Sequence, residues 1–200
     1  MAIAINGSSN TITGIAVGGL PNGIVDNDMI ANSTIAEAKL AANVNTITMV
    51  DQWRLTSNLT VGTLSLTTIS ANWERVDSVG QGTLNGGMTH SSGVWTFPET
   101  GIYKVEFNML ASSTANTNYM DVQLRFNNAG ATPDTLISRI LQRNDASHYC
   151  SGHLSTLLDI DNTSDCSLRF QSQSAVATGT ITGNSLYNYC YATFTRLGDT

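Results

Sequence analysis

The sequence predicts an all-β fold, an antiparallel sandwich of about eight to ten strands over residues 50–200, preceded by an N-terminal arm over residues 1–49. Short segments rich in β-branched and aromatic residues recur between clusters of Gly, Asn, Ser and Thr, which is the spacing of a sandwich or barrel. Several segments alternate apolar and polar residues with a period of two, and none after residue 50 keeps a helical period. We therefore expect the chain after the arm to consist of strands and turns.

The clearest strand covers residues 101–109, where apolar and polar side chains alternate, and residues 119–126 repeat the pattern. One face of each strand is expected to be buried and the other to be polar. The inward set is Tyr103, Val105, Phe107, Met109, Met120, Val122, Leu124 and Phe126, and the outward set is Lys104, Glu106, Asn108, Asp121, Gln123 and Arg125. Residues 111–118 are then interpreted as a polar connection between two antiparallel neighbours.

Six further strands are expected, over residues 73–78, 93–97, 136–142, 148–160, 167–173 and 186–197. Pro98 cannot donate to a strand ladder and so ends the strand before it, and Gly101 permits the turn into the next strand. The three cysteines, Cys150, Cys166 and Cys190, are widely spaced and odd in number, which does not fit a disulfide framework. We expect free thiols and synthesis in a reducing cytoplasm.

The first fifty residues are small, polar and repetitive, with no large aromatic residue before Trp53. Residues 24–43 fit either a short helix or an extended thread, and both alternatives stay open. In either form the arm cannot bury its apolar side chains by itself. We expect a neighbouring subunit or a host surface to cover these apolar residues, which are Ile3, Ile5, Ile12, Ile15, Leu20, Met29, Ile30 and Leu40.

Charged residues make up 12% of the chain and its net charge is −6, so it lacks the basic surface that phosphate binding requires, and nucleic acid is not an expected partner. The sequence has neither a signal peptide nor an apolar run long enough to span a bilayer, so no membrane partner is expected. Because His90, His148 and His153 lack the sequence setting of a nucleophile's base, we expect no catalytic residue and no cofactor.

Residues 159–165 hold three carboxylates, those of Asp159, Asp161 and Asp165. An oxygen-rich loop of this kind is a candidate calcium site. Asp and Asn side chains also bond to their own backbone in turns, which is the simpler interpretation.

The last expected strand, residues 186–197, needs cover on both faces, because tyrosines lie on one face and apolar residues on the other. Such a strand lies in the middle of a sandwich or at a subunit interface.

Residues 93–105 contain a strand followed by Pro98, Gly101 and Tyr103, and this pattern resembles a signature of the tumour-necrosis-factor and complement globular-head superfamily. The alternating strand that follows, and the aromatic final strand, support the resemblance. It implies an antiparallel jelly-roll that assembles as a homotrimer, with its last strand near the threefold axis. The residues that we assign to the trimer interface are Tyr187, Tyr189, Tyr191, Tyr103 and Phe107.

Residues 3–15 and 18–23 are similar to leaders of tail-fibre and head-decoration proteins from tailed bacteriophages, and residues 35–41 resemble linking repeats of such fibres. This implies a non-enzymatic virion surface protein, made in the host bacterial cytoplasm, whose arm binds phage capsid or tail proteins. An arm of about 50 residues reaches at most ~170 Å, which favours a capsid decoration, cement or knob protein. The alternative is a short tail fibre or fibre tip that binds a receptor or host-surface glycan.

Overall fold

The computed structural model describes residues 4–6, 11–13, 47–128, 134–175 and 178–199. The chain divides into two units, Met1–Val44 and Asn45–Thr200. In the first unit, β1 (Ala4–Asn6) pairs with β2 (Thr11–Thr13) in antiparallel orientation. The helix or thread considered for residues 24–43 lies outside the described residues.

The second unit, which we call the head, is built from two antiparallel sheets, and its described residues contain no helix. The first, the β9 sheet, has the order β4-β14-β9-β15-β3-β6, with β12 paired to the other edge of β9. Its strands are β3 (Met49–Leu55), β4 (Leu59–Val61), β6 (Trp73–Arg75), β9 (Gly101–Ser113), β12 (Tyr149–Ile160), β14 (Gly179–Ile181) and β15 (Tyr191–Gly198).

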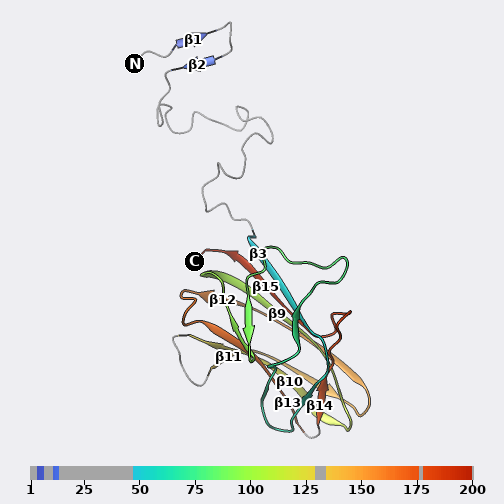
Figure 1. Ribbon diagram of the computed structural model, residues 1–200. Coiled ribbons are helices and arrows are strands. Elements are labelled where there is room, and N and C mark those ends of the chain that lie inside the picture. The colour runs from blue at the N-terminus through green and yellow to red at the C-terminus, as the bar shows by residue number, and fades with distance from the viewer. Residues whose placement is uncertain (1–3, 7–10, 14–46, 129–133, 176–177, 200) are drawn as a thin grey trace. The chain divides into compact units, whose positions relative to one another are not determined.

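The second sheet, the β10 sheet, has the order β11-β10-β13-β8-β7, with β5 paired to β13. Its strands are β5 (Thr67–Thr68), β7 (Thr89–Ser91), β8 (Val94–Thr96), β10 (Thr117–Asn127), β11 (Thr135–Asn144) and β13 (Ser167–Ser174). Figure 1 shows β3, β15, β9 and β12 running side by side in one layer, while β10, β11 and β13 belong to the other. The fold is thus an all-β antiparallel jelly-roll sandwich, as the sequence predicts.

The core lies between the two sheets, and β9 supplies one side of it with a strict alternation of buried and half-buried residues. Aromatic side chains fill its centre. The indole of Trp95, which has no exposed surface, packs within about 5 Å of the rings of Trp53, Trp73 and Phe194, measured between ring centroids. Such edge and tilted ring contacts add to the hydrophobic stabilisation that burial provides.

Two expectations about β9 and β10 were wrong. The two strands are not neighbours in one sheet, because β9 pairs with β12 and β15 whereas β10 pairs with β11 and β13. The connection between them crosses from one sheet to the other and covers only residues 114–116, since Ser112 and Ser113 still pair with β14. Most of these polar residues therefore belong to the ends of β9 and β10 rather than to a long loop.

The final strand also differs from expectation. It begins at Tyr191 rather than at Leu186, and residues 182–190 form a connection from β14 to β15. The structure adds β3, which the sequence analysis did not identify because Asp51 and Arg54 interrupt its apolar pattern. Both of these charged side chains are buried. Four short strands of two or three residues, β4, β5, β7 and β14, were missed as well, and the described residues of the head contain thirteen strands, more than the eight to ten expected.

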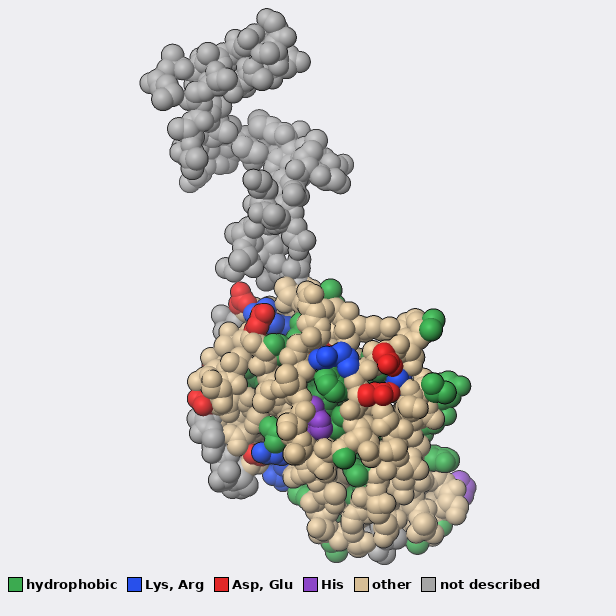
Figure 2. All heavy atoms as spheres, viewed as in Figure 1, with side chains coloured by type: hydrophobic (Ala, Val, Ile, Leu, Met, Phe, Trp, Pro, Cys, Tyr) green, Lys and Arg blue, Asp and Glu red, His purple; other side chains and the backbone are tan. Residues whose placement is uncertain are grey.

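The polar side chains of Asp121 and Gln123 in β10 face away from the core as expected, but they are buried. The Asp121 carboxylate accepts two hydrogen bonds from the Arg139 guanidinium, both at 2.9 Å, one from the Gln123 amide at 2.8 Å and one from the Gln173 amide at 3.1 Å. A buried charge is tolerated when it is paired and hydrogen-bonded in this way. Elsewhere the surface is polar with few charges, as Figure 2 shows for one face.

Candidate functional site

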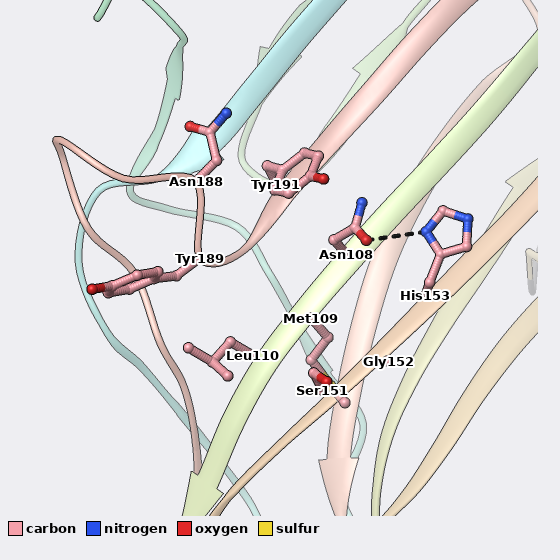
Figure 3. A pocket seen from close by; sticks show the side chains of 9 residues that line it. All are labelled: Asn108, Met109, Leu110, Ser151, Gly152, His153, Asn188, Tyr189 and Tyr191. Carbon is pink, nitrogen blue, oxygen red and sulfur yellow. Dashed lines mark hydrogen bonds between the residues drawn. The ribbon is translucent and has the colours of Figure 1, made fainter.

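A pocket of about 400 Å³ opens on the outer face of the β9 sheet, where β9 changes its neighbour (Figure 3). On one edge of β9, β15 pairs as far as Asn108 and β14 takes over at Ala111. Met109 and Leu110 lie in the gap between these two strands, and the connecting residues 182–190 leave the sheet there. We call this feature the tyrosine pocket; it is lined by Asn108, Met109, Leu110, Ser151, Gly152, His153, Asn188, Tyr189 and Tyr191.

The connection that forms one wall is fixed to β3 by backbone hydrogen bonds. The amide of Asn184 donates to the carbonyl of Leu55 at 2.7 Å, and the amide of Leu55 donates to the carbonyl of Cys190 at 2.9 Å. Within the connection, the Asn184 side-chain oxygen accepts from the amides of Leu186 and Tyr187 at 2.7 and 2.9 Å. Asn is favoured in turns because its side chain bonds to the backbone two and three residues ahead.

A chain of side-chain hydrogen bonds orients Asn188 in this wall. The Gln52 amide group donates to the Thr193 hydroxyl at 2.9 Å, which leaves the Gln52 carbonyl oxygen to accept from the Asn188 amide group, also at 2.9 Å. The side-chain oxygen Oδ1 of Asn188 is then buried with no hydrogen-bond partner among the described residues. A buried acceptor without a donor costs free energy, and Asn188 places one such acceptor in this wall.

The opposite wall comes from β9 and β12, whose residues Asn108 and His153 lie directly opposite each other in the ladder. The Asn108 side-chain oxygen and the His153 Nδ1 atom are 3.1 Å apart and share a hydrogen bond. In Figure 3, Asn108 lies between Tyr191 and His153, while Asn188 and Tyr189 lie on the side of the connection. Glu106 flanks the pocket and is paired with Lys104 at 2.8 Å. The pocket therefore combines aromatic rings with uncharged hydrogen-bonding groups.

The structure separates the five residues assigned to the trimer interface. Tyr103 and Phe107 have no exposed surface in a single chain, because they point into the core between the sheets. Their assignment to a subunit interface was wrong. Tyr187 and Tyr189 are exposed on the connection before β15, with rings stacked at a centroid distance of 5.9 Å, and Tyr191 begins β15. Of the predicted residues, Tyr189 and Tyr191 meet in the tyrosine pocket.

The candidate calcium site is not assembled. In the part of the chain that the structure describes, no group of three carboxylate, His or Cys side chains is placed to hold a metal ion. Asn162 instead builds a turn, since its side-chain oxygen accepts from the amide of Ser164 at 2.9 Å and its amide group donates to Asp165 at 2.7 Å. Asp161 accepts a hydrogen bond from the thiol of Cys166. The described hydrogen bonds of this loop fit the turn interpretation for Asp165, while Asp161 bonds to Cys166.

The three histidines have separate hydrogen-bond partners. His90 accepts a hydrogen bond at Nε2 from the amide of Gly93 at 3.1 Å, and burial lowers its pKa below the ordinary value of 6.5. The Nδ1 atom of His148 lies 2.9 Å from the carbonyl oxygen of Ala146. His153 bonds with Asn108 in the tyrosine pocket. These arrangements support hydrogen bonding and packing roles for the three side chains.

The sequence analysis missed an exposed aliphatic edge on the head. β11 ends the β10 sheet, and β12 pairs with β9 alone in the β9 sheet. Four aliphatic side chains of these strands are exposed, and Leu141 and Leu157 show 51% and 61% of their surface. We call these exposed residues of β11 and β12 the aliphatic edge; they are Leu136, Ile137, Leu141 and Leu157. Leu141 lies opposite Asp121 on the outer face of the β10 sheet, and Leu157 lies opposite Lys104 on the outer face of the β9 sheet. The sequence signal of the aliphatic edge is a strand with apolar residues at both odd and even positions.

Eight arm residues were expected to contact another protein. Ile5 and Ile12 lie in β1 and β2, where their backbones pair directly. The other six, Ile3, Ile15, Leu20, Met29, Ile30 and Leu40, lie outside the described residues. No helix in the described ranges is long and apolar enough to cross a membrane.

No protein-family model and no curated protein sequence matches the chain. Solved structures do match. Murine APRIL is 15% identical over 74% of this chain and 98% of its own, with a TM-score of 0.52. Eiger TNF from S. frugiperda is 11% identical over 78% and 96%, with a TM-score of 0.55. The vertex protein P5 of the phage PRD1 is 13% identical over 77% and 99%, with a TM-score of 0.52. The head therefore has a TNF-like jelly-roll fold, which it shares with these three proteins.

Proposed function

We propose that this chain is a non-enzymatic structural protein of a tailed-phage virion. In this proposal the head assembles as a homotrimer on the virion surface, as a capsid decoration, cement or knob protein, and the N-terminal arm attaches it to phage capsid or tail proteins. The division of the chain into two units and the vertex protein among proteins of the same fold support this proposal. The observation that carries it is the aliphatic edge.

The aliphatic edge is of a kind that soluble proteins avoid leaving uncovered. β11 and β12 have ten and twelve residues, and each ends a sheet or lies at its border. Long, flat, apolar edge strands promote association with other chains unless something covers them. β11 carries two charged side chains: Arg139 is held by Asp121, and Arg143, at one end of the strand, is paired with Asp145. A second copy of this chain is the proposed cover.

A trimer requires that the aliphatic edge of one copy meet a different surface of the next, because a closed ring of three uses heterologous contacts. The exposed surface of these four aliphatic side chains adds up to that of about two fully exposed side chains. Burying one fully exposed aliphatic side chain contributes about 1.5–3 kcal/mol of binding free energy. Each of the three contacts in a trimer therefore gains about 3–6 kcal/mol from this edge alone. Additional area from the receiving surface adds to that value.

The test is the mass of the full chain in solution, measured by light scattering coupled to size exclusion. The wild type is expected at three times the chain mass of 21.3 kDa. Replacing Leu141→Ser and Leu157→Ser together removes the apolar surface of about one fully exposed side chain from each contact. This is expected to raise the trimer dissociation constant by at least about a hundredfold. Val79→Ser, a change at a fully exposed loop position, is the matched control. A wild type that runs as a monomer defeats the proposal.

The place on the virion is tested by electron cryo-microscopy of the phage. A copy number close to that of the major shell protein supports a decoration or cement role. A few copies at the tail support the second candidate, a short fibre or fibre tip with a receptor-binding or carbohydrate-binding role. That candidate is favoured by one specific observation, the tyrosine pocket.

A further inference from the structure

We propose that the tyrosine pocket binds a neutral saccharide, through the rings of Tyr189 and Tyr191 and the side chains of Asn108, Ser151 and His153. This assigns a ligand to a site that a purely structural role does not need. It also gives Tyr189 and Tyr191 a role in ligand binding rather than in the trimer contact that the sequence suggested. The proposal depends on the geometry of the head and not on its number of subunits.

The shape and the aromatic lining fit a sugar ring. The volume of about 400 Å³ lies in the range of small-ligand sites. A pyranose presents C–H bonds on its faces, and these pack favourably on the flat face of an aromatic ring while the hydroxyl groups keep their hydrogen bonds. Tyr189 extends this surface, because its ring is stacked on that of Tyr187 with an angle of 23° between the planes. A tyrosine also offers its hydroxyl group for hydrogen bonding.

The polar groups of the pocket match hydroxyl groups, which both donate and accept hydrogen bonds. The Asn108 side-chain oxygen is engaged with His153, so the amide group of Asn108 is left as a donor in the lining. The second ring nitrogen of His153 and the hydroxyl groups of Ser151 and Tyr191 add further partners.

The charge of the lining selects a neutral ligand. None of the nine lining residues is an Asp, Glu, Lys or Arg. Glu106, beside the pocket, is already paired with Lys104 and lies 3.8 Å from His153. An anionic sugar would lose its hydration in the pocket and find no cation in the lining to replace it, which is unfavourable. A neutral sugar carries no such cost.

The wall formed by residues 182–190 is arranged before any ligand binds. Backbone hydrogen bonds to Leu55 and the side-chain bond between Asn188 and Gln52 hold this connection against β3. The rings of Tyr189 and Tyr191 therefore do not need to be ordered by the ligand. Binding sites that are ordered in advance lose less conformational entropy on binding.

The experiment is saturation-transfer NMR and calorimetric titration of the full chain. The probes are D-glucose, D-galactose, D-mannose and N-acetyl-D-glucosamine, with D-glucuronic acid as the anionic comparison. At least one neutral sugar is expected to bind, and D-glucuronic acid is expected not to. Tyr189→Ala, which removes a ring, and Asn108→Asp, which removes a donor without changing the shape, are each expected to weaken binding by about tenfold or more.

Tyr149→Ala is the matched control, because Tyr149 is an exposed tyrosine of β12 that does not line the pocket. It is expected to bind as the wild type does. Absence of binding by all four neutral sugars at about 50 mM overturns the proposal, as do Tyr189→Ala and Asn108→Asp variants that bind normally. Loss of the oligomer in Tyr189→Ala, without any sugar binding by the wild type, assigns the pocket to a subunit contact instead. The mass measurement separates this result from a failure of the trimer proposal.

Discussion

Replacing Asp121→Asn is expected to destabilise the head strongly, because its carboxylate is fully buried and accepts four hydrogen bonds. An asparagine fits the same space but removes the negative charge and turns one acceptor oxygen into a donor that faces other donors. Breaking a buried ion pair by removing one partner costs about 3–5 kcal/mol. Arg139 is about one-third exposed, so water recovers part of its solvation and the lower end, about 3 kcal/mol, is expected.

The assay is thermal and urea unfolding of the full chain at one fixed concentration, followed by tryptophan fluorescence, since Trp95 is buried in the core. For a head of this size, about 3 kcal/mol corresponds to a fall in Tm of about 6–12 °C. The concentration is held constant because association raises apparent stability. The matched control is Asp145→Asn, which breaks the exposed pair of Arg143 and Asp145, joined at 3.4 Å. An exposed pair contributes less than about 1 kcal/mol.

A double-mutant cycle completes the test. Arg139→Gln alone leaves the Asp121 carboxylate buried with only amide donors, and so it is also expected to be strongly destabilising. Because the two side chains act as a unit, the double variant is expected to lose clearly less free energy than the sum of the single losses. Additive losses, or an Asp121→Asn variant that unfolds within about 0.5 kcal/mol of the wild type, would refute this account of how β10 tolerates a buried charge.

Two further predictions concern β12 and the core. Gly152→Ala places a methyl group against the Cγ2 atom of Ile140, and overpacking of this kind is expected to lower the free energy of unfolding by about 1–3 kcal/mol, measured in urea. Burial lowers the pKa of His90 below 6.5, so the unfolded chain binds the proton more tightly than the folded one and stability falls as pH decreases through that value. His90→Gln keeps an acceptor for the amide of Gly93 but does not titrate, so its unfolding free energy is expected to change less than that of the wild type between about pH 7 and about pH 5. If the variant and the wild type show the same dependence of unfolding free energy on pH, the lowered pKa of His90 is contradicted.

The parts of the fold that the sequence predicts are those with a clear period of two. The alternation in β9 gives its buried face residue by residue, and Pro98 and Gly101 locate the turn before it. Strand pairing is different, because the neighbour of a strand depends on contacts between residues far apart in the chain. Thus β9 and β10, adjacent in sequence, belong to opposite sheets, and β3 is found only when the partners of Asp51 and Arg54 are known.

The candidate site was only partly predictable for the same reason. The tyrosines near the C-terminus are a visible signal, and two of the three do meet in one pocket. Their partners Asn108 and His153 come from two other strands, and only the register of β9 against β12 places them opposite each other. The gap that opens the pocket arises where β14 succeeds β15 beside β9, which no local pattern encodes.

The residues of the aliphatic edge lie on regular strands, whereas residues 186–190 do not. A strand that is apolar on both faces needs both faces covered. Residues 186–190 leave the sheet as a connection, so this requirement does not apply to them. β11 is one strand of ten residues with a register shift at Ile137, so Leu136 and Leu141 pair with the outward-facing Arg125 and Asp121. Ile140 is buried against the core, whereas Leu141 on the other face is half exposed. In the proposed trimer, β11 and β12 supply the surface that a second copy covers, and the tyrosines of the pocket remain available for the proposed ligand.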